Sequence, residues 1–326
     1  MQHRTLGQDG FAVSEIGLGC WQFGGDFGPL EEATAMQIMQ TAVAQGVNFF
    51  DTADVYGGGR SETFIGRFLQ NSDTNVRIAT KFGRNGDVYP DQYSEARLRQ
   101  SVEGALGRLG VDTIDLLQLH CIPIEVLRAG DIFDWLRTIQ AEGLIRRFGA
   151  SVETEEQALL CLNVEGLQSL QIIFNILRQK FVTHVLPQAQ AKGVGLIVRL
   201  PLASGLLAGK FTADTTFDAS DHRNYNRDGA AFYVGETFAG LPFGKGVELT
   251  ELLRPHVPAG MTMAQMAQRW ILDHDAVSTV IPGASSVAQA QANAAVSGMP
   301  SLSAELHQTL SDIYQQSAHD FIRGLY

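Results

Sequence analysis

The sequence predicts an α/β protein with a (β/α)8 TIM barrel, an N-terminal β-hairpin and a long loop after the seventh strand. Eight short apolar runs occur from Ile16 onward, and a segment with helical spacing follows nearly every one. The 326 residues contain no linker, low-complexity segment or internal repeat, so we expect residues 1–326 to form one barrel domain. A doubly wound sheet is the rival fold. Its glycine fingerprint is missing, because Gly17-x-Gly19 leads into Cys20-Trp21.

The expected elements follow in chain order. Asp9-Gly10 between two short runs predicts a hairpin of residues 4–7 and 11–15. The expected barrel strands are residues 16–19, 47–50, 76–80, 114–119, 148–151, 170–174, 194–200 and 278–281. The expected helices are residues 31–45, 62–69, 95–109, 125–141, 155–162, 182–191, 264–274, 286–296 and 304–316. Residues 201–259 are predicted to be irregular apart from one helical segment near 247–254, and a loop of this length is expected to cover a bound ligand.

Composition narrows the possible partners. The formal net charge is -11, the pI is about 5.2 and no basic run is present, so we expect neither nucleic acid nor a membrane surface as a partner. The three cysteines are widely spaced, which argues against a metal site or a disulfide framework. The first residues have no signal-peptide core and no apolar run is long enough to span a membrane. A cytoplasmic enzyme with reduced thiols is therefore expected.

Four polar residues occur at the ends of three expected strands. Asp51 ends the run 47–50 and Tyr56 follows in the next turn, Lys81 follows 76–80, and His120 follows 114–119. In a (β/α)8 barrel the chemistry takes place at the carboxyl ends of the strands. Taken singly, each residue has an ordinary explanation: an Asp that caps a turn, a Tyr that packs, a surface Lys or a structural His. Their joint presence indicates a catalytic site.

These four residues suit the reduction of a carbonyl group. If hydride adds to the carbonyl carbon, the oxygen needs a proton, and Tyr56 is the candidate general acid. An ammonium group from Lys81 would lower the pKa of the phenol, and Asp51 would supply the counter-charge of Lys81. His120 could orient the carbonyl oxygen through a hydrogen bond. The sequence gives less support for metal-dependent or serine hydrolase chemistry. The H-E-x-x-H motif of zinc sites and the G-x-S-x-G motif of serine hydrolases are both missing.

The chain resembles the aldo-keto reductases from end to end. The blocks GLGCWQFGG, FFDTADVYGGGRSE, ATKFG, DLLQLHCIP, FGAS, PLASGLLAGKF and VIPGASSVAQAQAN occur in the order of that family. The pattern is closer to the bacterial and potassium-channel β-subunit-like branch than to aldose reductases. The resemblance implies a (β/α)8 barrel, reduction of an aldehyde or ketone with NAD(P)H, and a catalytic tetrad of Asp51, Tyr56, Lys81 and His120.

The resemblance also implies a set of cofactor and substrate contacts. The implied cofactor contacts are Trp21, Asp51, Ser151, Gln171, Arg199, Pro201, Leu202, Gly205, Leu207, Lys210, Arg223, Gly283, Ser285, Ser286, Gln289 and Asn293. The implied substrate contacts are Trp21, Tyr56, Arg84 and His120. Two positions depart from the family, because Val152 replaces a common Asn and Arg199 replaces an aromatic residue that stacks on the nicotinamide. NADP(H) is the expected cofactor, but residues 281–293 contain no Lys or Arg, so NAD(H) is also expected to be accepted.

Several functions remain open at this level. The first is a reductase for a small polar or sugar-like carbonyl compound. The alternatives are a nucleotide-binding regulatory or redox-sensor subunit like the potassium-channel β subunits, a sugar dehydrogenase that works in the oxidative direction, and a barrel isomerase or lyase without nicotinamide.

Overall fold

The N-terminal hairpin closes one end of the barrel. A computed structural model describes residues 1–326, and in it β1 (His3–Leu6) and β2 (Phe11–Ser14) pair antiparallel as predicted. The side chains of Leu6, Phe11 and Val13 form one buried cluster with residues of four barrel strands. Two of these, Phe49 and Leu116, are the first residues of their strands. The hairpin therefore covers the amino-terminal end of the barrel and leaves the opposite end for a site.

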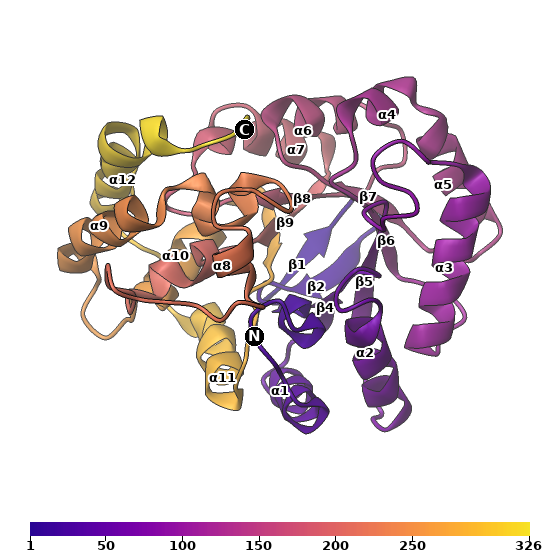
Figure 1. The fold of residues 1–326 in the computed structure, drawn as a ribbon, viewed down its shortest axis with the longest axis horizontal. Helices are drawn as coiled ribbons and strands as arrows, with labels where there is room; N and C mark the ends of the chain where they lie inside the picture. Colours follow the sequence, from indigo (N-terminus) through magenta and orange to yellow (C-terminus); the bar gives the residue numbers. More distant parts are fainter.

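Eight parallel strands form the barrel, as the sequence predicted. They are β3 (Leu18–Gly19), β4 (Phe49–Asp51), β5 (Arg77–Phe82), β6 (Leu116–His120), β7 (Phe148–Ser151), β8 (Ser169–Ile173), β9 (Gly195–Arg199) and β10 (Val277–Val280). Each strand pairs with its neighbours in chain order. Parallel bridges between Ile16 and Val280 and between Gly19 and Gly283 join the first strand to the last. These bridges close the barrel, so all strand ends meet at one rim (Figure 1).

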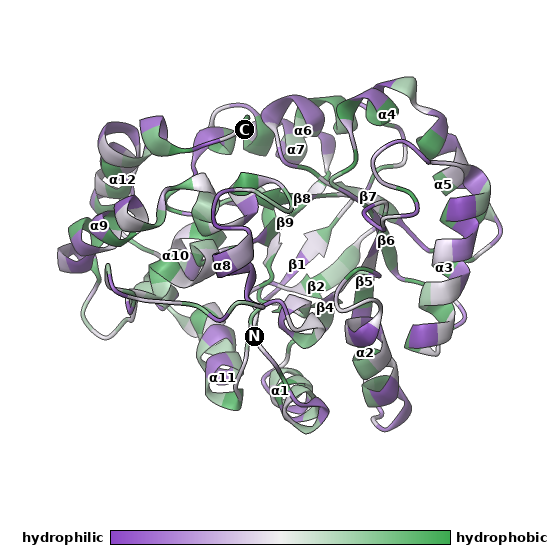
Figure 2. Ribbon diagram, in the orientation of Figure 1, coloured by the Kyte–Doolittle hydropathy of each residue, from purple (hydrophilic) through white to green (hydrophobic).

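Helices surround the barrel on all sides (Figure 1). They are α1 (Glu32–Ala44), α2 (Arg60–Gln70), α3 (Glu95–Leu109), α4 (Ile124–Ala129), α5 (Asp131–Ala141), α6 (Glu155–Cys161), α7 (Val185–Lys192), α10 (Met263–Leu272), α11 (Val287–Ala295) and α12 (Ala304–Ile313). Hydrophobic and hydrophilic residues alternate along them, as expected for helices with one face on a core (Figure 2). None of the helices combines the length and apolar character needed to span a lipid bilayer.

One predicted helix was wrong. Residues 125–141 form α4 and α5 rather than one helix, because Gly130 adopts the left-handed conformation with φ 87° and ends α4. Glycine reaches this conformation without the steric cost that a Cβ atom imposes. Hydrophobic spacing continues across the break, so the sequence pattern alone did not reveal it.

The long segment 201–259 is more ordered than predicted. It contains α8 (His222–Tyr225), several 3-10 turns and α9 (Phe243–Leu253), which begins earlier than the expected helix. Its middle part is held by the C-terminal tail, where the Arg323 guanidinium donates to the carbonyl oxygens of Arg227, Gly240 and Leu241. The segment thereby lies at the carboxyl ends of the strands, where its residues line the main cavity.

Candidate active site

The barrel brings the four predicted catalytic residues together. Asp51 ends β4, Lys81 lies in β5 and His120 ends β6, while Tyr56 lies in the turn after β4. The fully buried Lys81 ammonium donates hydrogen bonds to Asp51 Oδ2 at 2.6 Å, Thr52 O at 2.7 Å and Tyr56 Oη at 3.2 Å. Lys81 thus uses all three of its donors. Because the Tyr56 oxygen accepts from Lys81, the Tyr56 proton is free to point into the cavity.

The pKa of Tyr56 shifts in the opposite direction from the one that the sequence argument predicted. Burial raises the pKa of Tyr56 to about 12, and the Lys81 ammonium lowers this pKa by less than burial raises it. Tyr56 is therefore a neutral phenol that holds a proton at physiological pH. Burial opposes the charged form of Lys81, but the Asp51 carboxylate and Tyr56 outweigh it and raise the pKa of Lys81 above its ordinary value. Lys81 thus remains a cation beside the proton donor.

The second oxygen of Asp51 is held by two glutamines. Gln118 Nε2 donates to Asp51 Oδ1 at 3.1 Å and Gln171 Nε2 donates to the same atom at 2.6 Å. Both Asp51 oxygens are therefore satisfied inside the barrel, which fixes the orientation of Asp51 toward Lys81. Gln171 also lines the main cavity, and its Oε1 is buried without a partner. This oxygen is available to a donor group of a ligand.

His120 is neutral and faces Tyr56. Burial, together with the charges of Lys81, Arg84 and Arg199, holds the pKa of His120 well below its usual range. Its Nδ1 is buried without a partner, so Nε2 is the ring nitrogen that a ligand can reach. The rings of His120 and Tyr56 have centroids 6.0 Å apart and lie nearly perpendicular. The two side chains can therefore approach the same oxygen atom of a substrate.

Trp21 packs on the other side of Tyr56. The two rings are stacked with centroids 5.9 Å apart, and Trp21 Nε1 donates to Asp26 Oδ2 at 2.9 Å. Asp26 also accepts a hydrogen bond from Tyr225, which belongs to the long segment after β9. The loop after β3 and the long segment therefore hold the aromatic wall of the site together.

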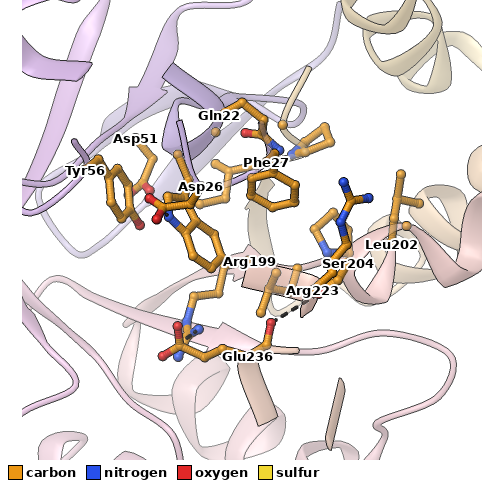
Figure 3. Close-up of a pocket in the computed structure, with 18 of the residues that line it drawn as sticks. Gln22, Asp26, Phe27, Asp51, Tyr56, Arg199, Leu202, Ser204, Arg223 and Glu236 are labelled. Carbon is orange, nitrogen blue, oxygen red and sulfur yellow. Dashed lines mark hydrogen bonds and ion pairs between the residues drawn. The ribbon is translucent and has the colours of Figure 1, made fainter. Parts of the chain in front are cut away.

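A cavity of about 1000 Å³ extends away from the catalytic groups (Figure 3). Most residues with an implied role in cofactor binding line it: Trp21, Asp51, Gln171, Arg199, Pro201, Leu202, Gly205, Lys210, Arg223, Gly283, Ser285, Gln289 and Asn293. Three others do not. Ser151 is buried with Oγ 3.5 Å from Cys121 Sγ, Leu207 is buried in the core, and Ser286 Oγ caps α11 by accepting from Gln289 N.

The structure adds two carboxylates that the sequence did not single out. Arg84 donates to Glu236 Oε1 at 2.7 Å and to Glu153 Oε1 at 2.8 Å. Arg199 lies 3.5 Å from the same Glu236 oxygen and donates to Cys121 Sγ at 3.3 Å. Glu153 follows β7 and Glu236 lies in the irregular segment after β9. Neither position carries a periodic or motif signal, so only the long-range contacts reveal them.

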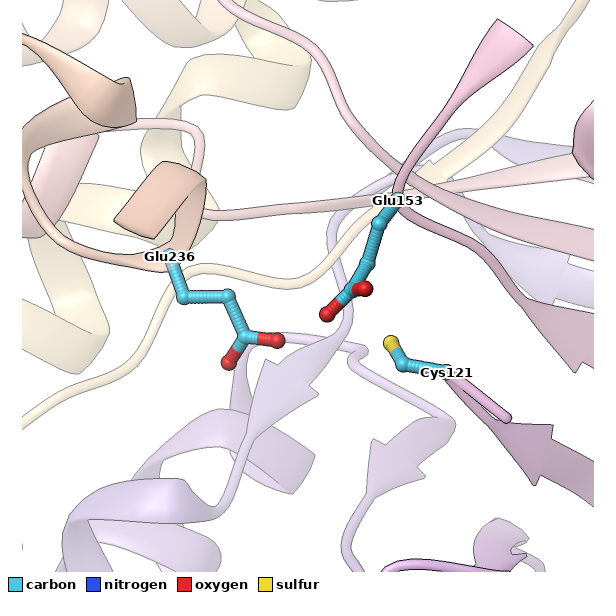
Figure 4. Close-up of side chains that lie close together, drawn as sticks. All are labelled: Cys121, Glu153 and Glu236. Atoms are coloured by element: carbon cyan, nitrogen blue, oxygen red, sulfur yellow. The ribbon is translucent and has the colours of Figure 1, made fainter. Parts of the chain in front are cut away.

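Glu153, Glu236 and Cys121 point toward one another (Figure 4). Their potential ligand atoms all lie within 4.8 Å of one another, a spacing that could hold a metal ion. Arg84 pairs with both glutamates and Arg199 pairs with Glu236. A further cation at this point would be repelled by both arginines, which argues against a metal site.

Comparison with known proteins gives consistent results. The model of the Aldo/keto reductase family matches residues 15–315. The chain is 28% identical over 330 residues to aldo-keto reductase YhdN of Bacillus subtilis, covering 98% of this chain and 96% of the relative. The holo form of aldo-keto reductase AKR11C1 from Bacillus halodurans has a TM-score of 0.77 and 27% identity, covering 100% of this chain and 98% of that one. Glycerol dehydrogenase AKR11B4 from Gluconobacter oxydans has a TM-score of 0.79 and 27% identity, and the match covers 99% of this chain and 98% of that one.

Proposed function

The chain belongs to the aldo/keto reductase family of oxidoreductases, and from this we propose that it reduces an aldehyde or ketone to the alcohol with NAD(P)H, using Tyr56 as the general acid. One observation carries the proposal. The Tyr56 oxygen accepts a hydrogen bond from the buried Lys81 ammonium, which leaves the Tyr56 proton for a ligand in the cavity. A proton donor beside a fixed cation is the arrangement that a developing oxyanion requires.

Each of the four catalytic residues has one task in this mechanism. A bound NAD(P)H, held by cavity residues such as Gln171 and Lys210, would supply the hydride. Tyr56 gives its proton to the carbonyl oxygen, and the Lys81 ammonium stabilises the phenolate that remains. Asp51 holds Lys81 in place, and the neutral His120 donates a hydrogen bond that orients the carbonyl. Acid–base assistance of this kind is worth about 10²–10⁴-fold in rate.

The residues along the cavity fit a nicotinamide nucleotide. Gln171 Oε1 is a buried acceptor without a partner, as a carboxamide donor would require. Gly205 has φ +100° and lets the backbone approach a ligand closely. Lys210 supplies positive charge for phosphates, Arg223 lines the cavity while paired with Asp221, and α11 begins beside Ser285. We therefore propose NADP(H) as the cofactor, with NAD(H) also accepted. The holo state of one similar structure supports a bound cofactor in this fold.

The cavity favours a small polar substrate. Arg84, Glu153, Arg199 and Glu236 all line it close to His120, so an apolar substrate would leave these groups desolvated without new partners. One similar structure is that of a glycerol dehydrogenase. This similarity supports the proposal of a hydroxyl-bearing substrate, and it leaves alcohol oxidation as the alternative direction of the reaction. We propose a small polar or sugar-like carbonyl compound as the substrate.

An aldehyde panel assayed with both nucleotides tests the proposal. The parent should consume reduced nucleotide with at least one polar aldehyde, and Tyr56→Phe should bind nucleotide but turn over far more slowly. A regulatory or redox-sensor subunit would bind nucleotide, seen by fluorescence titration, without multiple turnovers on any aldehyde. A barrel isomerase or lyase would show no nucleotide binding at all.

A further inference from the structure

We propose that Glu236 is a specificity filter: it occupies the two arginines of the substrate cavity, so the site excludes carbonyl compounds that carry a carboxylate and accepts neutral ones. This inference rests on the proposed function and names the class of substrate. It concerns residues outside the catalytic tetrad, and it makes the long segment after β9 a determinant of selectivity.

One carboxylate oxygen bridges both arginines. Glu236 Oε1 lies 2.7 Å from Arg84 Nη1 and 3.5 Å from Arg199 Nη1. The three side chains come from separate segments, namely the loop after β5, the end of β9 and the 3-10 turn Val234–Glu236. Their side chains are 14%, 11% and 7% exposed for Arg84, Arg199 and Glu236 respectively. A carboxylate between two guanidinium groups is the arrangement by which arginines recognise carboxylate ligands.

The bridge lies where a substrate would be bound. Arg84, Arg199 and Glu236 line the same cavity as Tyr56 and His120. Figure 3 shows Tyr56, Arg199 and Glu236 around this cavity. Both arginines are near enough to His120 to lower its pKa, and Arg199 Nη2 contacts Cys121, the residue after His120. A substrate whose carbonyl meets His120 would therefore place its other end near these guanidinium groups. The side chain of Glu236 already fills that position.

The Glu236 carboxylate engages both arginines, which disfavours an additional anion. Glu153 Oε1 binds the other end of the Arg84 guanidinium at 2.8 Å, and burial together with the Glu236 charge raises the pKa of Glu153 to about 7. An incoming carboxylate would find both arginines engaged and would lie beside the like charge of Glu236. A hydroxyl group meets no such penalty, because it can donate to a carboxylate and accept from Arg199 Nε, which is buried without a partner.

Glu236 could instead serve only to anchor the long segment. In that case its removal would loosen the cavity for every substrate and would change kcat/KM for neutral and anionic aldehydes by similar factors. The filter predicts a change in their ratio, which separates the two roles.

Methyl 4-oxobutanoate and succinic semialdehyde form a matched pair of substrates for this test. They have the same carbon chain, but the second carries a free carboxylate in place of the neutral, polar methyl ester. We expect the parent to favour methyl 4-oxobutanoate in kcat/KM by at least about tenfold. Glu236→Gln should shift the ratio toward succinic semialdehyde by at least about tenfold, because two guanidinium groups become available to the substrate. Glu251→Gln removes the same charge from the exposed face of α9 and should leave activity and ratio unchanged.

A binding measurement keeps the inference independent of turnover. Succinate, titrated by calorimetry, should bind Glu236→Gln at least about tenfold more tightly than it binds the parent. If Glu236→Gln does not fold, Glu153→Gln serves as the second variant, because it weakens the ion pair at the other end of Arg84. It should shift the kcat/KM ratio and the succinate affinity in the same direction as Glu236→Gln, by a smaller factor. The filter is overturned if the parent uses both aldehydes with equal kcat/KM. It is also overturned if a folded variant leaves the kcat/KM ratio and the succinate affinity unchanged. Absence of turnover with any aldehyde would instead overturn the proposed function, whatever succinate does.

Discussion

Replacing Tyr56 with Phe removes one atom from the site and nearly nothing else. The lost hydroxyl makes one hydrogen bond, with Lys81 Nζ at 3.2 Å. Lys81 keeps its shorter bonds to Asp51 and to the Thr52 carbonyl, and the Phe ring can keep the stacking contact with Trp21. We therefore expect a loss of at most about 3 kcal/mol in unfolding free energy, from one hydrogen bond to a charged group. Nucleotide affinity should stay close to that of the parent.

The effect on turnover should be much larger. Without the phenol, no group that we place next to the carbonyl oxygen can donate a proton, because His120 is neutral and acts only through a hydrogen bond. Loss of a general acid costs about 10²–10⁴-fold, which corresponds to roughly 3–5 kcal/mol in the barrier. We expect kcat to fall by at least about 10²-fold with little change in nucleotide affinity.

A double-mutant cycle with Lys81→Met tests the coupling. In the parent, removing the Lys81 ammonium should also lower kcat strongly, because it destabilises the phenolate that forms on Tyr56. In the Tyr56→Phe background the same change should cost little, because the group on which Lys81 acts is already absent. The assay is consumption of reduced nucleotide with one good aldehyde, accompanied by thermal melting and fluorescence titration of nucleotide.

Two results would refute this reasoning. Turnover of Tyr56→Phe within about tenfold of the parent would show that Tyr56 is not the acid. Equal losses from Lys81→Met in both backgrounds would show that Lys81 contributes without Tyr56, for example only by holding Asp51.

The remaining predictions concern a buried carboxyl group, the choice of nucleotide and the long segment after β9. Burial and the Glu62 carboxylate raise the pKa of Asp54 from 3.8 to about 6. The protonated Asp54 side chain therefore stabilises the fold below pH 4, and this contribution is lost as the pH rises through 6. Asp54→Asn should raise the unfolding free energy at pH 8 by no more than about 3 kcal/mol and change it little at pH 4, as measured by chemical denaturation at both values. Arg223 is neutralised by a bidentate pair with Asp221, so NADPH should be favoured over NADH in kcat/KM by less than about 10²-fold, and a preference above about a thousandfold would contradict this. Bound nucleotide should slow proteolysis within residues 201–259, and identical cleavage with and without it would show that this segment does not cover the cofactor.

The sequence by itself determined the barrel and the four residues that we propose as catalytic. Short apolar runs and helical spacing are local signals, and eight of them in this order permit few folds. Asp51, Tyr56, Lys81 and His120 could be identified because each follows a strand, and the carboxyl ends of parallel strands meet at one rim. The break at Gly130 was missed because hydrophobic spacing continues across it, whereas the left-handed φ of 87° that ends α4 there is seen only in the folded backbone.

Only the tertiary structure decided the direction of the pKa shifts in the site and the surroundings of Arg84 and Arg199. The sequence argument placed a cation beside Tyr56 and predicted a lowered pKa, but burial, which has no sequence signal, outweighs that cation and raises the pKa to about 12. Glu236 lies in a segment whose course depends on contacts distant in sequence, with Arg84 bound to Glu236 and the C-terminal Arg323 bound to Gly240. Such contacts have no period and no motif. The place of Glu236 beside Arg84 and Arg199 therefore appears only when the chain is folded.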